Sequence, residues 1–462
     1  MRTHDHTPAR RSSGIAQRTL DPARASACAH LGTLAHGCPD LYPLDLDRTG
    51  LSPRQNIFAN AIVEFATRRW LTLRWLIEQR LDKPFTQLQP EMCGVLLSGA
   101  AQLVFLDSVP AYAAIDESVE WAKQTMRPGA GRLANAVLRR IADLVSDGAV
   151  RAPAWSMAQN EIPLSDGTAI VLNSNEMPSD ERMRFGIATS CPSALYESMC
   201  RSFPEGQARA IAYHNMAPAP TVLNIEHSLS SAQIQDLDPH EHDGFAVYRG
   251  NHRDLTNLLS TCDDVWAQDV ASAQAVKLAA SRYPAPGLVI DLCAGLGTKT
   301  RQLAAVFPDA KIIATDTNAS RRDTLRSVFQ WHERVEVVDP HETHRWLGKA
   351  DLILLDVPCS NTGVLARRVE ARYRATDQTI AALVSVQRQI IINAIPMLAP
   401  GGKLVYSTCS IDPRENREQA AWAVTQHQLR IDHEQFTLPG GGPDQPQTRY
   451  TDGSYAVILA LA

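Results

Sequence analysis

Apolar residues recur at three- and four-residue spacing after residue 50. The stretches NIFANAIVEFATRRWLTLRWLIEQRL (56–81) and PEMCGVLLSGAAQLVFL (90–106) show this spacing, which is typical of helices that bury one face. Two more helices are predicted in VPAYAAIDESVEWAKQ, after Pro110, and in GRLANAVLRRIADLV, after Gly129. The pattern therefore predicts an all-helical domain over residues 49–145.

From residue 265 to 462 the pattern changes to short apolar strands that alternate with helices. This alternation is typical of a parallel sheet covered by helices on both faces. The predicted strands are 287–293, 310–316, 334–339, 350–356 and 401–409. We therefore expect a multidomain chain whose C-terminal domain is a doubly wound, Rossmann-like α/β fold.

The remaining segments give weaker signals. Residues 1–48 are predicted to be a disordered tail, because the arginine-rich start has no apolar stretch of the kind that defines a secretory signal; an organellar transit peptide is the alternative. Residues 146–178 contain Pro153 and Pro163 and little periodicity, so a linker is predicted there. Residues 179–264 are predicted to form a small mixed α+β domain.

Composition narrows the class of protein. The chain has 462 residues, of which 44% are hydrophobic and 21% charged, as in globular proteins with several domains. No apolar run reaches the roughly 18 residues that a membrane span needs. The nine cysteines are scattered without a CxxC pair, which argues against a zinc site or a disulfide framework and predicts a reducing, cytoplasmic location. We expect no metal and no membrane partner, and a monomer.

Net charge is −5, but the helical segment is locally basic. Residues 51–141 carry eleven Lys and Arg against eight Asp and Glu. Any contact with a polyanion is therefore expected to begin in the N-terminal half or at a local basic stretch.

Polar side chains follow the predicted strands at the edge where ligands bind in open α/β sheets. The first strand leads into DLCAGLGTKT, in which Gly295 and Gly297 permit a tight turn before a helix. This loop lacks the last glycine of a P-loop and the third glycine of a dinucleotide fingerprint. Alone, it is as consistent with an ordinary strand-turn-helix connection as with a nucleotide-binding loop. Asp316 stands 23 residues after Cys293, a spacing at which an acid reaches a ribose hydroxyl. Together with Asp339, which could face an adenine or merely cap a turn, these residues favour an adenosine-containing cofactor.

Two cysteines stand at the ends of neighbouring predicted strands. Cys359 lies in DVPCSNTGVL (356–365) and Cys409 in YSTCS (406–410). Structural cysteines usually lie inside strands, whereas these follow strands and have small polar neighbours, so a catalytic role is favoured.

The two cysteine motifs resemble those of the Sun-type RNA cytosine-5 methyltransferases, which use S-adenosylmethionine. The loop before Lys299 and the segment WAQDVASAQAV (266–276) are similar to the same family, and the N-terminal helices resemble a NusB-type RNA-binding domain. That combination is similar to the branch that methylates 16S ribosomal RNA, free or in the assembling small subunit. The resemblance implies that Cys409 is the nucleophile, that Cys359 acts in product release, and that Asp356 contacts the cytosine. The implied cofactor-binding residues are Cys293, Ala294, Gly295, Leu296, Gly297, Thr298, Lys299, Asp316, Asp339 and Asp356.

A basic stretch, ARRVEARYR (366–374), follows the first cysteine motif. Its arginines are predicted to hold RNA phosphates, with a solvated helix face as the alternative: Arg367, Arg368, Arg372 and Arg374. The cofactor loop has lost the family's proline and one glycine, and Val369-Glu370 stands where the family has Pro-Asp, which leaves the exact RNA open.

Three alternatives remain at this point. The same reaction on transfer RNA or another RNA would need the same residues. A non-catalytic RNA-binding or antitermination factor would be expected to have lost a cysteine or a strand-end acid. A nicotinamide-dependent dehydrogenase has no need of the two cysteines.

Overall fold

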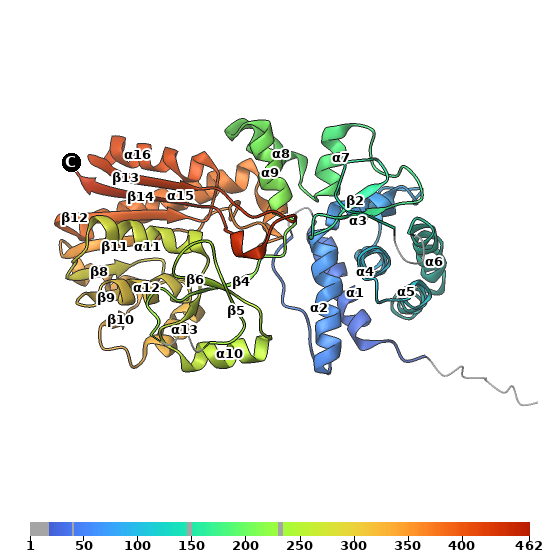
Figure 1. The fold of residues 1–462 in the computed structure, drawn as a ribbon, viewed down its shortest axis with the longest axis horizontal. Coiled ribbons are helices and arrows are strands. Elements are labelled where there is room, and N and C mark those ends of the chain that lie inside the picture. Colours follow the sequence, from blue (N-terminus) through green and yellow to red (C-terminus); the bar gives the residue numbers. More distant parts are fainter. Residues whose placement is uncertain (1–17, 39–40, 146–149, 230–233) are drawn as a thin grey trace, which may run out of the picture.

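The structure is a computed structural model that describes residues 18–38, 41–145, 150–229 and 234–462. Figure 1 shows the N-terminal helices (blue to teal) on the right and a sheet domain (yellow to red) on the left, with the green helices α8 and α9 between them. The part of the predicted tail at residues 1–17 lies outside the described residues.

The N-terminal part is helical, as predicted. Its helices are α1 (Pro22–Gly37), α2 (Pro53–Arg68), α3 (Trp70–Glu78), α4 (Pro90–Phe105), α5 (Ala111–Thr125) and α6 (Pro128–Ala142). Proline begins four of them, where its missing N–H costs nothing, and Ser52 and Gln55 form a capping box at α2. Helix α4 is buried along most of its length and forms the centre of the bundle.

The predicted tail is wrong over its described part. Residues 22–37 form α1, whose Ala27, Cys28 and Leu31 are buried in the same core as α4. A Cβ on Gly94 of α4 would lie only 2.2 Å from the carbonyl oxygen of Cys28, so the two helices pack backbone to backbone. Small residues make this contact. Because they are only weakly apolar, the sequence shows no clear hydrophobic stripe that would predict α1.

The predicted linker is also wrong where the structure describes it, from residue 150 onward. Three short strands form an antiparallel sheet in the order β1-β3-β2: β1 (Arg151–Ala152), β2 (Glu161–Pro163) and β3 (Ala169–Val171). Ile162 and Ile170 are buried in the core of the helical bundle. Strands of two or three residues are too short to produce a visible alternation, and the segment therefore looked irregular.

A mixed segment joins the two large parts. It contains α7 (Glu181–Ala188), α8 (Ser193–Ser202), α9 (Glu205–His214) and α10 (His252–Thr261). Its four-stranded sheet has the order β5-β6-β4-β7, with β4 (Thr221–Asn224), β5 (Leu237–Pro239), β6 (Phe245–Tyr248) and β7 (Trp266–Ala267).

The C-terminal domain confirms the predicted doubly wound α/β fold. Its sheet has the order β10-β9-β8-β11-β12-β14-β13, and the five strands from β10 to β12 are parallel. Apolar clusters cover both faces of the sheet. The strands are β8 (Leu288–Asp291), β9 (Lys311–Ala314), β10 (Val335–Val337), β11 (Ala350–Asp356), β12 (Leu398–Thr408), β13 (Leu429–Thr437) and β14 (Ser454–Leu461). Strands β13 and β14, which the sequence pattern did not predict, add an antiparallel edge.

Helices pack on both faces of this sheet. They are α11 (Val270–Arg282), α12 (Thr298–Val306), α13 (Ala319–Phe329), α15 (Asp377–Ala394) and α16 (Arg417–His427). The short helix α14 (Ala371–Arg374) lies instead against the helical bundle and the mixed segment. Among the described residues, one stretch, Asp377–Met397, is long and apolar enough to cross a membrane by length and composition. A single such helix is weak evidence, because helices that pack in soluble domains pass the same test.

Three arginines lie at the junction of the helical bundle, the mixed segment and the C-terminal domain. Arg372 donates to the backbone carbonyls of Arg68, Thr189 and Asn215, at the C-terminal ends of α2, α7 and α9. Arg68 and Arg69 donate to carbonyls from the same region. Cations at helix C-termini are favourable because those carbonyls lack partners within the helix. Burial lowers the pKa of Arg372 to about 10, so it stays charged at neutral pH.

The prediction that Arg372 binds RNA is therefore wrong. The residue is only 2% exposed, and its guanidinium donates to these backbone carbonyls. Arg372→Met should lower the free energy of unfolding by about 3 kcal/mol, since buried carbonyls lose a charged donor. Urea denaturation measures this loss. Arg368→Met, at an exposed neighbour, should change stability by less than about 0.5 kcal/mol. A stable Arg372→Met protein with weakened RNA binding would contradict the structural role.

Candidate active site

The carboxyl ends of the parallel strands bring the predicted residues to one edge of the sheet. The loop 293–299 follows β8, Asp316 follows β9 and Asp339 follows β10. Asp356 ends β11, and Cys409 follows β12. Because β8 and β12 both pair with β11, the cofactor loop, Asp356 and Cys409 are neighbours in the sheet.

The two cysteines of the motifs lie in direct contact. The distance between Cys359 Sγ and Cys409 Sγ is 3.3 Å, and neither forms a disulfide. Hydrogen bonding to Cys409 and then burial raise the pKa of Cys359 well above its ordinary value. Cys359 therefore keeps its proton and can donate it in a hydrogen bond to the sulfur of Cys409.

An ion pair lies beside the cysteines. Lys299 Nζ donates to Asp356 Oδ2 at 2.7 Å and to Ser272 Oγ at 3.3 Å, while Ser407 Oγ donates to Asp356 Oδ1 at 3.1 Å. Burial lowers the pKa of Lys299, but the Asp356 carboxylate more than offsets this, and the net pKa is raised. Lys299 is thus a fixed positive charge at the site.

These groups line one narrow cavity of about 40 Å³. Lys299, Asp356 and Cys409 line it together with residues from α11 and from the start of β14. Ser272, Ser407, Asp452 and Gly453 were not identified from the sequence. Ser272, Asp452 and Gly453 belong to no motif, and Ser407 was given no role although it lies within YSTCS, so only the fold brings them to the site.

A buried carboxylate holds the first cysteine motif in place. Glu415, fully buried, accepts from the backbone N–H and the hydroxyl of Ser360, and from Gln387 Nε2 at 3.0 Å. Burial raises the pKa of Glu415. Glu415 gives no signal in the sequence, because it lies in a short 3-10 helix after a proline and belongs to no motif.

The loop after β8 has room and donors for a nucleoside cofactor. Gly295 and Gly297 have φ of +57° and +92°, and a Cβ on Gly295 would meet nothing within 4 Å, so open space borders the loop. The N–H of Gly295 donates to Asp316 Oδ2 at 3.1 Å, which fixes that carboxylate. Helix α12 begins at Thr298 and directs its N-terminus toward the loop, where an anionic group is stabilised. These residues fit a ligand with a ribose and a carboxylate.

Asp339 has partners that the sequence did not reveal. Its Oδ1 accepts from Arg322 Nε at 2.8 Å and from Arg326 Nη2 at 3.1 Å. The pKa of Asp339 is lowered, chiefly by the hydrogen bond from Arg326. A contact of Asp339 with adenine stays a prediction, and the carboxylate would have to accept from the adenine while it also accepts from these two arginines.

Three further arginines of the basic stretch after Cys359 were predicted to contact RNA phosphates: Arg367, Arg368 and Arg374. Arg367 forms ion pairs with Asp452 at 2.6 Å and with Asp269 at 3.0 Å, and the residue is exposed, so its contact with an RNA phosphate stays a prediction. Arg374 lies against Glu370. Arg368 is exposed and, among the described residues, its side chain has no hydrogen-bond or ion-pair partner. Among the four arginines of the stretch, Arg368 is the one whose charge has no partner among the described residues.

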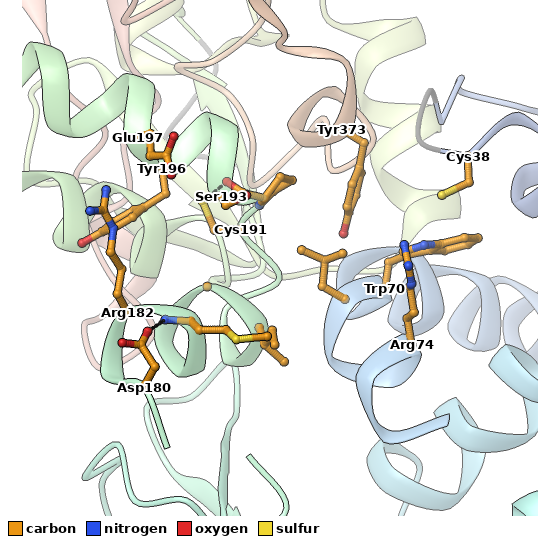
Figure 2. A pocket seen from close by; sticks show the side chains of 15 residues that line it. Cys38, Trp70, Arg74, Asp180, Arg182, Cys191, Ser193, Tyr196, Glu197 and Tyr373 are labelled. Carbon is orange, nitrogen blue, oxygen red and sulfur yellow. Dashed lines mark hydrogen bonds between the residues drawn. The ribbon is translucent and has the colours of Figure 1, made fainter. Parts of the chain in front are cut away.

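A wider cavity of about 480 Å³ lies elsewhere, between α3, α7, α8 and Tyr373. In Figure 2, Trp70 and Arg74 lie on one side and Cys191 and Tyr196 on the other. None of the strand-end residues lines it. The chemistry that the cysteines can perform therefore belongs to the narrow cavity.

Fold and site together define a methyltransferase of the doubly wound class joined to a NusB-type helical domain. A family model described as the NusB family matches residues 34–143, and one described as 16S rRNA methyltransferase RsmB/F matches residues 284–455. The crystal structure of PH0851 is similar in fold, with a TM-score of 0.69, 17% identity, and coverage of 96% of this chain and 99% of that one.

Curated relatives cover both domains. Ribosomal RNA small subunit methyltransferase B of Serratia proteamaculans is 30% identical over 381 residues, which are 79% of this chain and 80% of the relative. The protein of the same name from Vibrio cholerae is 29% identical over 451 residues, or 94% of each chain. The chain belongs to the RsmB/F family of 16S rRNA methyltransferases.

Proposed function

We propose that the protein transfers a methyl group from S-adenosylmethionine to C5 of a cytosine in 16S ribosomal RNA, through a covalent bond between Cys409 and C6. The observation that carries the proposal is the 3.3 Å contact between Cys409 and Cys359 beside the Lys299–Asp356 pair. C5 of cytosine is a weak nucleophile, and addition of a thiolate at C6 converts the ring into an enamine that can attack a methyl donor. The names of the relatives support the choice of 16S ribosomal RNA.

Each group of the site has a role in this scheme. Cys409 adds to C6 as the thiolate. The Lys299–Asp356 pair holds an ammonium group beside the ring, and this positive charge and donor stabilise the negative charge that develops on the ring when the thiolate adds. The thiol of Cys359 donates to the sulfur of Cys409 and so stabilises that sulfur when it leaves as a thiolate, after C5 has lost its proton to water.

The cofactor would lie along the carboxyl edge of the sheet. Asp316 would hold the ribose and Asp339 the adenine, while loop 293–299 and the start of α12 would hold the methionine end. When bound, S-adenosylmethionine supplies an electrophilic methyl group. The target base must leave its stack to reach a narrow cavity, which favours a cytosine in a single-stranded or loop region. We infer that the protein acts in the cytoplasm, where ribosomal subunits assemble.

Incubation with labelled S-adenosylmethionine and unmodified 16S RNA, transfer RNA or no RNA, followed by nucleoside analysis, tests the proposal. We expect 5-methylcytidine in the 16S sample alone. Label in transfer RNA would support the proposed reaction but show that transfer RNA is the substrate. Absence of label from free 16S RNA and from an assembling small subunit would contradict the proposal and favour a binding factor.

A further inference from the structure

Asn361 has a backbone conformation that its residue type adopts at a cost. Its φ is +61°, in the left-handed region that favours glycine, although asparagine tolerates it better than most residues. It lies two residues after Cys359, in the loop that follows β11. This conformation places its amide between the two cysteines.

Both ends of the amide are engaged. Asn361 Oδ1 accepts from Cys409 Sγ at 3.3 Å, and Nδ2 donates to the backbone carbonyl of Cys359 at 3.0 Å. A carbonyl oxygen can only accept, so the bond to Cys359 fixes which end of the amide faces Cys409. The Asn361 amide thus links the Cys409 thiol to the backbone of Cys359, whose own thiol contacts Cys409.

The loop around Asn361 is held at the end of β12. The N–H of Gly363 donates to the carbonyl of Cys409 at 2.9 Å, and the N–H of Val364 donates to the carbonyl of Asn361 at 3.0 Å. A Cβ on Gly363 would lie 2.5 Å from the carbonyl oxygen of Gly453, so the loop has no room to shift inward. The amide is therefore kept at a set position relative to Cys409.

We propose that Asn361 is a positioning residue for the methyl transfer, which orients the thiol of Cys409 and holds that sulfur in register with Cys359. The inference rests on the proposed function, because it assumes that Cys409 is the nucleophile. Orientation matters because a nucleophile that is poorly aimed at its target loses much of the rate that positioning provides. Neither glycine nor alanine at this position could make the contact.

Two variants separate the amide from the backbone. Asn361→Gly keeps the left-handed conformation and removes the amide, and it should lower kcat about tenfold with KM for both substrates within about twofold. Asn361→Asp places a carboxylate where the amide oxygen was, and it should move the acidic limb of the pH–rate profile to higher pH by about one unit, because negative charge opposes a thiolate. Asn393→Asp, an exposed site on α15, is the matched control and should leave the profile unchanged.

Alkylation of Cys409 by iodoacetamide, followed by peptide mass spectrometry, tests the contact without turnover. Asn361→Asp should alkylate about tenfold more slowly than the parent near pH 7, with the difference vanishing at high pH. Equal alkylation rates and superimposed pH profiles would overturn the inference, whether or not the protein methylates 16S RNA. If Asn361→Asp slowed alkylation but the parent protein formed no 5-methylcytidine, the contact between Asn361 and Cys409 would stand and the proposed function would be overturned.

Discussion

Replacing Cys409 by alanine is expected to abolish methyl transfer, with the single-turnover rate falling about a thousandfold or more. The loss is this large because an unactivated C5 is too weak a nucleophile, and Lys299 and Asp356 can stabilise charge only after a sulfur has added to C6. Binding of S-adenosylmethionine should change less than about twofold, since the cofactor residues follow other strands. Rapid-quench assays with labelled cofactor measure the rate, and equilibrium dialysis measures the binding.

The matched control for this variant is Cys262→Ala, at a half-buried cysteine after α10 that does not line the narrow cavity. It should methylate at the parent rate. If Cys409→Ala retained the parent rate, the nucleophile would have to be another group, and Cys359 would be the first to examine.

Replacing Cys359 by alanine should instead trap the protein on its RNA. The thiol of Cys359 contacts the sulfur that must leave C6, and without it the departing thiolate loses a hydrogen-bond donor inside a buried site. Turnover should therefore slow about a hundredfold while a covalent protein–RNA complex accumulates. A denaturing gel with labelled RNA detects that complex.

The trapped complex also has its own control. The double variant Cys359→Ala with Cys409→Ala should give no complex, because the bond to C6 is made by Cys409. A complex that still formed in the double variant, or that formed in the parent and not in Cys359→Ala, would mean that the two cysteines have the opposite roles.

The strand-end residues were predictable because one topological rule places them. Asp316, Asp356 and Cys409 each follow an apolar run, and the carboxyl ends of parallel strands meet at one edge whatever the intervening helices do. The contact between Cys359 and Cys409 follows from the same rule, since their strands are neighbours. The closeness of Lys299 to Asp356 follows too, because β8 pairs with β11.

The errors arise where burial depends on distant parts of the chain. Arg372 looks like part of a surface stripe in the sequence, yet the ends of α2, α7 and α9 surround it. Helix α1 was missed because glycine and alanine make its contact with α4. Asn361 has no motif of its own, and its contact with Cys409 exists only because two loops meet.

Covalent capture on 16S RNA that contains 5-fluorocytidine shows directly whether Cys409 bonds to C6. Fluorine at C5 blocks the loss of a proton that release requires, so methyl transfer should leave the protein bound to the RNA. Peptide mapping of the captured complex should find the nucleotide on Cys409, and capture should require S-adenosylmethionine. Attachment at another residue, or no capture under conditions in which unsubstituted RNA is methylated, would contradict the account.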